Sequence, residues 1–181
     1  HYNGQAWFSQ PVQRGPALRG LDTDMLGGIV AVGDKGRILR WNKVGWSIDV
    51  SSTQNNLRDV VSTGSAAAVA VGQYIILDWD GSTWSKVAFG PPKDLHAVWG
   101  LASTDMYAVG EDGAVLKRNN TTQKWSSIDV PVLSTLRGVF GTGSGLVMAV
   151  GDKGQCIRKA PGGTFELIKT PTTRNLRDIW G

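Results

Sequence analysis

The chain is poor in the residues that most enzymes and metalloproteins use at their active centres. Its 181 residues include one cysteine, two histidines and two glutamates, which are Glu111 and Glu166. The single thiol of Cys156 cannot form an internal disulfide, and two histidines, one of them His1, leave little material for a catalytic triad or a metal cluster. We therefore expect no catalytic residues, no metal ligands and no cofactor. An enzyme is not expected, although a glycosidase built from paired Asp carboxylates stays open as a minor alternative.

Long apolar runs and clusters of one charge are also missing. An apolar run such as Ala66–Val71 spans only six residues, far fewer than the roughly 18 that a membrane-spanning helix needs. The formal net charge is +4, and its Lys and Arg residues are spread along the chain. Neither membrane insertion nor nucleic-acid binding is therefore expected.

Glycine and tryptophan, in contrast, are abundant, with 24 and 8 residues respectively. This mixture is typical of many tight turns joining short strands, with aromatic anchors between them. The composition therefore favours an all-β protein.

A repeat of about forty residues runs through the sequence. A Leu-Arg-x-Leu/Val/Ile segment recurs, with its leading leucine at positions 18, 57, 95, 136 and 176, and the third copy has His in place of Arg. An Ala-Val-Gly segment follows in four copies, beginning at positions 31, 70, 108 and 149. An aromatic residue closes each full unit, at Trp46, Trp84, Trp125 and Phe165, and Trp7 is the same landmark of a preceding unit.

Each repeat has the periodicity of four short strands separated by turns. In the first repeat the predicted strands are 18–21, 29–32, 37–41 and 46–50, and Gly33-Asp34-Lys35-Gly36 forms the turn between the second and third. Four antiparallel strands per forty residues predict a β-propeller. We expect one domain over residues 1–181, with repeats near 18–56, 57–94, 95–135 and 136–175. Residues 1–17 and 176–181 would form a fifth, incomplete blade shared between the two ends, and the chain could be a fragment of a longer one.

The motifs carry a resemblance to a known group of propellers. The pattern Leu-Arg-x-Val-Trp/Phe-Gly, then Ala-Val-Gly-Asp-x-Gly, then Asp-Gly-x-Thr-Trp resembles bacterial repeats related to the photosystem II stability and assembly factor family and to the sialidase-type Asp-box propellers. Asp80-Gly81-Ser82-Thr83-Trp84 is similar to an Asp-box turn, whereas the second repeat has Gln73-Tyr74 where the Asp-x-Gly turn is expected. The resemblance implies a propeller fold, and the assembly-factor family implies an arginine patch.

The second position of each predicted first strand is the most regular polar feature. A ring of basic residues at the mouth of the central channel could bind an anion, an acidic loop or a carboxylated sugar. The alternative is that each arginine stacks on a tryptophan or pairs with a nearby acid such as Asp22, Asp59 or Asp178, which would join blade to blade. The candidate ring consists of Arg19, Arg58, His96, Arg137 and Arg177.

The aromatic residues fall into two groups. The regularly placed closing aromatics are expected to be core wedges between blades. The irregularly placed ones are the candidates for exposed contacts with a ligand, and these are Trp41, Tyr74, Trp79 and Tyr107.

These features favour a non-catalytic recognition or assembly module that binds a protein partner through one face of the propeller. A glycan-binding propeller lectin is the second hypothesis, because several similar sites on one propeller would give avidity. A structural domain of a larger particle or appendage is the third. Self-association through the incomplete blade and an extracellular or periplasmic location are further expectations.

Overall fold

The chain folds into four sheets of four strands each. The computed structural model describes residues 5–6, 9, 11–24, 26–64, 67–101, 106–119 and 121–181. Over these residues the helical elements are three 3-10 turns, η1 (Asp34–Gly36), η2 (Glu111–Gly113) and η3 (Asp152–Gly154). None of the described helices is long and apolar enough to cross a membrane.

Each sheet is formed by four consecutive strands, and every pairing is antiparallel. The first sheet contains β1 (Leu18–Thr23), β2 (Ile29–Gly33), β3 (Ile38–Trp41) and β4 (Trp46–Asp49). The second contains β5 (Leu57–Gly64), β6 (Ala67–Gly72), β7 (Ile75–Trp79) and β8 (Trp84–Lys86). The third contains β9 (Leu95–Trp99), β10 (Met106–Gly110), β11 (Val115–Arg118) and β12 (Trp125–Ser127). The fourth contains β13 (Leu136–Gly141), β14 (Val147–Gly151), β15 (Cys156–Lys159) and β16 (Phe165–Ile168).

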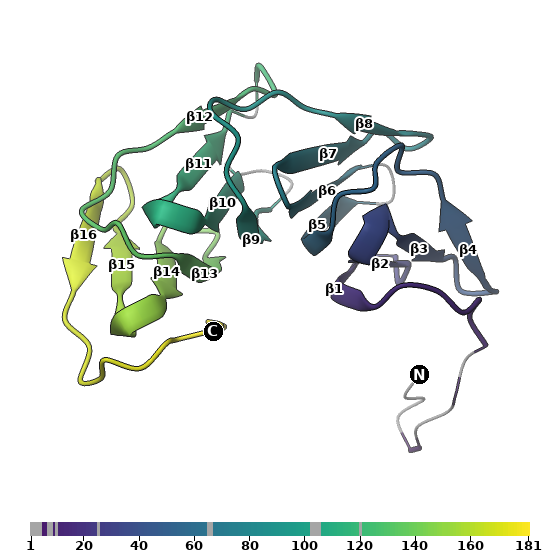
Figure 1. The fold of residues 1–181 in the computed structure, drawn as a ribbon, viewed down its shortest axis with the longest axis horizontal. Coiled ribbons are helices and arrows are strands. Elements are labelled where there is room, and N and C mark those ends of the chain that lie inside the picture. The colour runs from purple at the N-terminus through teal and green to yellow at the C-terminus, as the bar shows by residue number, and fades with distance from the viewer. Residues whose placement is uncertain are drawn as a thin grey trace.

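The four sheets stand side by side in an arc, as the blades of a β-propeller do (Figure 1). The first strands lie on the inner side, where β1 contacts β5, β5 contacts β9 and β9 contacts β13. The fourth strands, β4, β8, β12 and β16, lie on the outer side (Figure 1). The predicted all-β propeller is therefore confirmed, and the strands predicted for the first repeat agree with β1–β4 to within two residues at each end.

The hydrophobic core lies between neighbouring blades. The leading leucines Leu57, Leu95 and Leu136 are fully buried, and three apolar clusters fill the spaces between the first and second, second and third, and third and fourth blades. Trp84, Trp125 and Phe165 belong to these clusters, which confirms that the closing aromatics pack as wedges. Trp46 is only half-buried because its blade stands at one end of the arc.

The glycine of the Ala-Val-Gly segment is explained by a close backbone approach. A Cβ atom at Gly33 would lie 2.0 Å from the carbonyl oxygen of Ala17, and one at Gly110 would lie 2.1 Å from that of Asp94. The same carbonyls accept hydrogen bonds from the N–H groups of Asp34 and Glu111 at 2.8 and 2.9 Å. Any side chain at the glycine would push apart the strands that these bonds join.

The fifth blade is not formed as a sheet by the described residues. Neither residues 11–17 nor residues 171–181 contain a strand, and the landmark Trp7 lies outside the described residues. The segment 176–181 nevertheless runs along β13, because a Cβ atom at Gly138 would lie 2.9 Å from the Cα atom of Asp178. It lies where an inner strand would, but no strand of the described residues pairs with it to form a sheet.

Candidate functional site

A β-bulge in each first strand determines how the candidate basic residues are presented. In β1 the register passes from the Leu18–Gly33 pair to the Gly20–Val32 pair, so Arg19 is the extra residue. The same shift occurs in the other three blades, where the extra residues are Arg58, His96 and Arg137. A bulged residue has no partner opposite it and its side chain is re-aimed. The structure thus brings these four side chains to equivalent places at the inner edge of the blades.

Two of the arginines pair with the acidic residue of the 3-10 turn in their own blade. Arg19 donates from Nε and Nη2 to Asp34 at 2.7 and 2.8 Å, and Arg137 donates in the same way to Asp152 at 2.6 and 2.8 Å. In both pairs the acid follows the arginine by 15 residues. These hydrogen bonds are the main reason that the pKa values of Asp34 and Asp152 are lowered.

Arg58 instead pairs with an acid of the next blade. Gln73 stands where the other blades have the acidic residue of the turn, so Arg58 binds Asp94, with Nε–Oδ1 and Nη2–Oδ2 distances of 3.0 and 2.5 Å. Asp94 is 5% exposed, directly before β9. This ion pair therefore fastens the second blade to the third.

His96 lies beside this ion pair in a small cluster of polar groups. Ligand atoms of Asp94, His96 and Glu111 all lie within 4.8 Å of one another, an arrangement that could hold a metal ion. The sequence did not predict this grouping, because the three residues lie on different elements. Both carboxylate oxygens of Asp94 already accept hydrogen bonds from Arg58. Burial, and secondly the charge of Arg58, lower the pKa of His96.

The acids that the sequence suggested as arginine partners have another role, so that part of the prediction is wrong. Asp22 accepts a hydrogen bond from the N–H of Ser62 at 2.8 Å, and Asp59 accepts one from the N–H of Val98 at 2.9 Å. Both bonds join the inner strands of neighbouring blades. Burial raises the pKa of Asp59 to about 6, although the N–H groups of Val98 and Val60 act in the opposite direction. The expectation that acids join blade to blade thus holds, through backbone N–H groups for Asp22 and Asp59 and through the ion pair with Arg58 for Asp94.

The paired arginines retain free donors. Arg19, Arg58 and Arg137 each use Nε and Nη2 for the carboxylate, and within the described residues nothing engages their Nη1 groups. Arg177 has no ion pair within the described part of the chain, and its charge contributes to the lowered pKa of Asp152. Each of these groups can donate to an additional acceptor.

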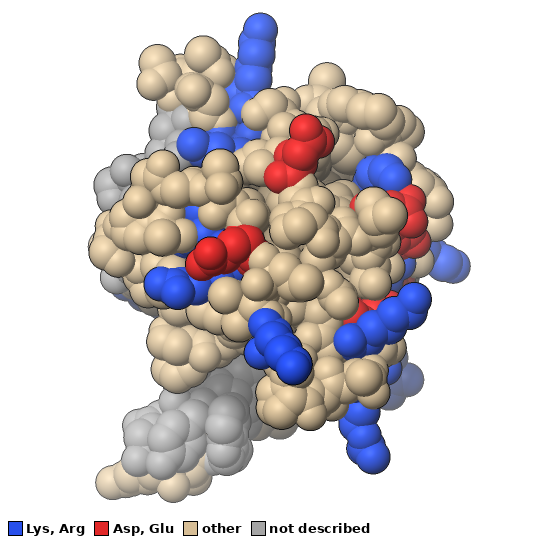
Figure 2. All heavy atoms as spheres, turned by 90° about the vertical axis from the view of Figure 1, so that its left-hand side faces the viewer, with Lys and Arg blue, Asp and Glu red and all other residues tan. Residues whose placement is uncertain are grey.

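Charge is not gathered into one continuous patch on the side of the arc that carries β16. Figure 2 shows Lys and Arg side chains there separated by uncharged residues, with Asp and Glu between them. A ligand that binds by total charge alone finds no concentrated target on this side. The positioned arginines at the inner edge are the more specific feature.

The four candidate aromatic contacts separate into three environments. Tyr107 is 3% exposed and packs edge-on against Phe165, with ring centroids 6.1 Å apart, so its expected exposure is wrong. Tyr107 lies on β10, which is a middle strand of its sheet, and its side chain belongs to the core between the third and fourth blades. Tyr74 is 53% exposed and has a positive φ of 56° in the turn that lacks the Asp-x-Gly pattern.

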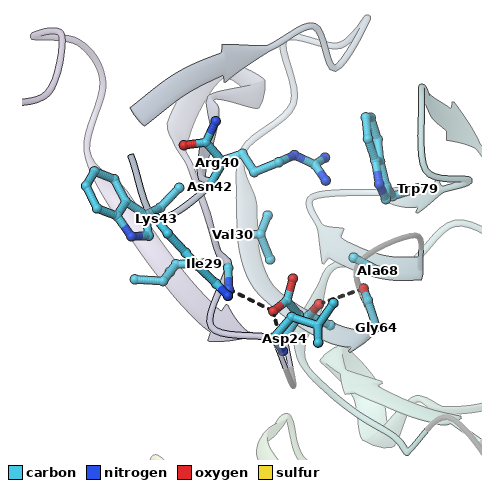
Figure 3. Close-up of a pocket in the computed structure, with 13 residues that line it drawn as sticks. Asp24, Ile29, Val30, Arg40, Asn42, Lys43, Gly64, Ala68 and Trp79 are labelled. Atoms are coloured by element: carbon cyan, nitrogen blue, oxygen red, sulfur yellow. Dashed lines mark hydrogen bonds between the residues drawn. The ribbon is translucent and has the colours of Figure 1, made fainter. Parts of the chain in front are cut away.

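Trp41 and Trp79 line one hollow between the first and second blades (Figure 3). The guanidinium of Arg40 lies over the Trp79 ring, 3.6 Å from its centroid. One ring face of Trp79 is therefore already covered by a cation. Lys43 and Asp24 also line the hollow, which has a volume of about 370 Å³.

The comparisons with known proteins support the fold. No family model and no curated protein matches the sequence. Among the solved structures that are similar is YCF48 bound to D1 peptide, with 17% identity, a TM-score of 0.69 and coverage of 91% of this chain and 57% of that chain. Another is YCF48 from Cyanidioschyzon merolae, with 18% identity, a TM-score of 0.72 and coverage of 96% of this chain and 63% of that chain. The chain thus spans about three fifths of the length of these neighbours. At this identity the likeness shows the β-propeller fold, in agreement with the resemblance that the repeats indicate.

Proposed function

We propose that this chain is a non-catalytic propeller module that binds an extended, carboxylate-bearing segment of a protein partner on the face that carries η1, η2 and η3. The observation that carries this proposal is the set of bulged arginines, each held by a carboxylate and each with an Nη1 group that no described residue engages. All three turns join a second strand to a third. They therefore lie at the same end of their blades.

The ion pairs prepare the arginines for binding. A free arginine loses rotamer entropy when it binds a ligand, but Arg19, Arg58 and Arg137 are already held by two hydrogen bonds each. Planar guanidinium groups recognise carboxylates by geometry as well as by charge. Because each pair is formally neutral, the site favours a ligand with correctly spaced acceptors over any polyanion.

A structural neighbour adds support of a general kind. One of the similar solved structures is YCF48 bound to D1 peptide, so a propeller of this fold binds a polypeptide segment there. Because the identity is only 17%, the partner of this chain has to be identified by experiment. A carboxylate-bearing peptide is the chemistry that the arginines fit.

The test uses an array of extended peptides, each made with a free C-terminal carboxylate and with a C-terminal amide. Acidic side chains and free carboxylates should raise binding. For the best peptide, Arg177→Gln and Arg137→Gln should weaken the affinity by roughly tenfold to a hundredfold, since hydrogen bonds to charged groups contribute about 1.5–3 kcal/mol.

Arg158→Gln is the matched control, because Arg158 lies on β15 and only approaches Glu166 at 3.9 Å. It should leave the affinity unchanged. Binding that is lost equally in all three variants, or that ignores acidic groups throughout the array, would overturn the proposal.

Glycan binding is the second candidate, and the hollow lined by Trp41 and Trp79 is the observation that favours it. A sugar ring stacks on an exposed aromatic face. Since Arg40 covers one face of Trp79, the hollow offers less stacking surface than two open indoles would. Binding to one glycan class on a glycan array, abolished by Trp41→Ala, would establish this function instead.

A further inference from the structure

The third blade carries a different pair of side chains at the place where the first and fourth blades have an arginine–aspartate ion pair. His96 is the bulged residue of β9, and Glu111 begins η2. Glu111 follows His96 by 15 residues, as Asp34 follows Arg19. Within the described residues, neither the imidazole of His96 nor the carboxylate of Glu111 has a hydrogen bond or an ion pair. Both side chains are half-buried, and their polar atoms are available to a ligand.

The carboxylate of Asp94 adds a third group that can bind a cation. Ligand atoms of Asp94, His96 and Glu111 all lie within 4.8 Å of one another. Each carboxylate oxygen of Asp94 accepts one hydrogen bond from Arg58. A carboxylate offers about four lone-pair positions, so each oxygen retains a position for a further partner.

The backbone holds these three residues in place. Asp94 and His96 flank Leu95, which pairs with Gly110, directly before Glu111. The N–H of Glu111 donates to the carbonyl oxygen of Asp94 at 2.9 Å. Gly110 permits this close approach, because a Cβ atom there would lie 2.1 Å from the same carbonyl oxygen. Strand pairing therefore brings the three side chains together without the help of an ion.

The charge balance of the cluster favours a cation. Arg58 compensates the carboxylate of Asp94, whereas no described residue forms an ion pair with Glu111. The imidazole does not supply the missing charge, because burial and secondly the charge of Arg58 lower the pKa of His96. A neutral imidazole and an ionised carboxylate are the protonation states that bind metal ions.

We propose that Asp94, His96 and Glu111 form a binding site for a divalent transition-metal ion such as Zn²⁺. Imidazole and carboxylate groups are both zinc ligands, whereas Ca²⁺ and Mg²⁺ bind through oxygen atoms. The site uses only one histidine, so the scarcity of histidine in the sequence does not exclude it. This proposal does not depend on the proposed peptide binding.

Binding requires a small movement of the side chains. Ligand atoms about 2.0–2.1 Å from a tetrahedral zinc ion lie roughly 3.3 Å apart, so the three groups have to approach one another by on the order of 1–2 Å. Glu111 can make this movement, because its side chain is one methylene longer than those of Asp34 and Asp152 at the same repeat position. Three protein ligands leave the fourth position of the ion to water.

The test measures zinc binding by isothermal titration calorimetry on protein that has been treated with EDTA and dialysed. The wild type should saturate at one zinc ion per chain. Because zinc would bind the folded state, the melting temperature should also rise with zinc concentration.

His96→Arg is the most informative variant, because arginine is the residue at this position in the other blades and should pair with Glu111 as Arg19 pairs with Asp34. The variant should therefore fold, with unchanged circular dichroism, but bind zinc at least about tenfold more weakly. Glu111→Gln should weaken binding by a similar factor.

His1→Gln is the matched control, because it removes the other histidine of the chain, and it should leave the zinc affinity unchanged. Three outcomes would overturn the proposal. They are the absence of saturable binding below millimolar zinc, full affinity in His96→Arg, and loss of binding in His1→Gln, which would assign the zinc to the N-terminus.

Discussion

Arg58 and Asp94 form a bidentate ion pair between the second and third blades, across 36 residues of sequence. The other paired arginines of the ring bind an acid within their own blade. The difference follows from Gln73, which cannot accept a charged pair as Asp34 and Asp152 do. The blade whose turn lacks the acid therefore has its ion pair at the junction with the next blade.

This junction predicts the effect of removing Asp94. Because Asp94 is buried, Asp94→Asn leaves the Arg58 guanidinium without a compensating charge, and we expect the free energy of unfolding to fall by about 2 kcal/mol. Urea denaturation measures the change. Asp112→Asn is the control, since the Lys93–Asp112 pair is exposed and such pairs contribute about 0–1 kcal/mol.

A second substitution tests the explanation from Gln73. Gln73→Asp restores the acid that the other turns have, and in the Asp94→Asn background it should recover part of the lost stability. No recovery in the double variant would show that Arg58 cannot reach its own turn.

The glycine of the Ala-Val-Gly segment predicts a strong effect of a single methyl group. Gly110→Ala would place Cβ 2.1 Å from the carbonyl oxygen of Asp94, and overpacking of this kind costs about 3 kcal/mol. Gly45→Ala is the control, because nothing lies within 4 Å of its Cβ position. Equal melting temperatures of the two variants would contradict this account of the repeat.

The buried carboxyl of Asp59 predicts a pH dependence of stability. Its pKa is raised from 3.8 to about 6, so between these values the native protein holds a proton that the unfolded chain has released. The contribution of Asp59 to stability is therefore present at pH 4 and is lost as the pH rises to 6, by at most on the order of 3 kcal/mol.

Asp59→Asn removes this titration. The difference in unfolding free energy between the variant and the wild type should change in favour of the variant as the pH rises from 4 to 6. Parallel curves over this range would show that Asp59 does not titrate there.

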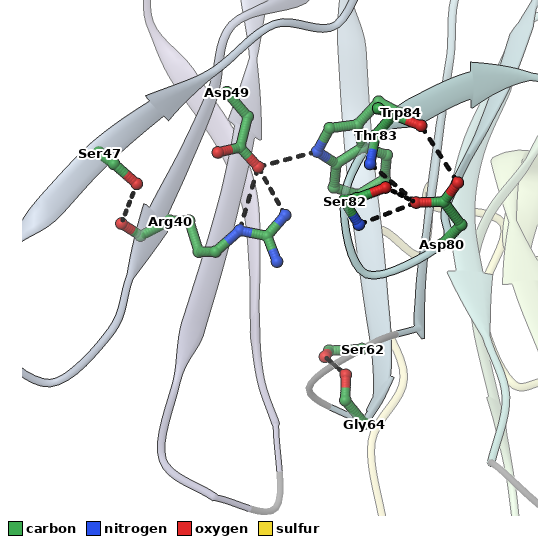
Figure 4. Close-up of polar contacts among 9 residues, drawn as sticks. All are labelled: Arg40, Ser47, Asp49, Ser62, Gly64, Asp80, Ser82, Thr83 and Trp84. Carbon is green, nitrogen blue, oxygen red and sulfur yellow. Dashed lines mark hydrogen bonds and ion pairs between the residues drawn. The ribbon is translucent and has the colours of Figure 1, made fainter.

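The tryptophans that close the blades predict a measurable difference between two similar substitutions. Trp84 donates from Nε1 to Asp49 at 3.0 Å, and the same carboxylate oxygen accepts from Arg40 (Figure 4). Trp125 is equally buried, but its Nε1 has no hydrogen-bond partner among the residues that the structure describes. Trp84→Phe should therefore cost about 1–2 kcal/mol more than Trp125→Phe in chemical denaturation. Equal costs would assign the role of Trp84 to packing alone.

Local chemistry explains why the blade turns could be anticipated from the sequence. Asp80 accepts hydrogen bonds from the N–H groups of Ser82 and Thr83, both at 2.8 Å (Figure 4). Asn42 and Asn119 do the same in their own turns. Side chains that bind the backbone two or three residues ahead fix a turn without help from the rest of the fold. The alternation of apolar and polar residues, together with the repeat, also predicted the order of the strands and which aromatic residues lie in the core.

The sequence by itself determined the repeat, the strands and the equivalent positions of the basic residues, because these depend on periodicity and on neighbours in the chain. Only the tertiary structure decided what those residues contact. The bulge that presents Arg19, the transfer of Arg58 to Asp94 and the burial of Tyr107 all depend on groups brought together across strands or blades. These cases share a large separation along the chain. Hydrogen bonds and packing act over a few ångströms in space, and the sequence does not show which residues 15 to 58 positions apart come into contact.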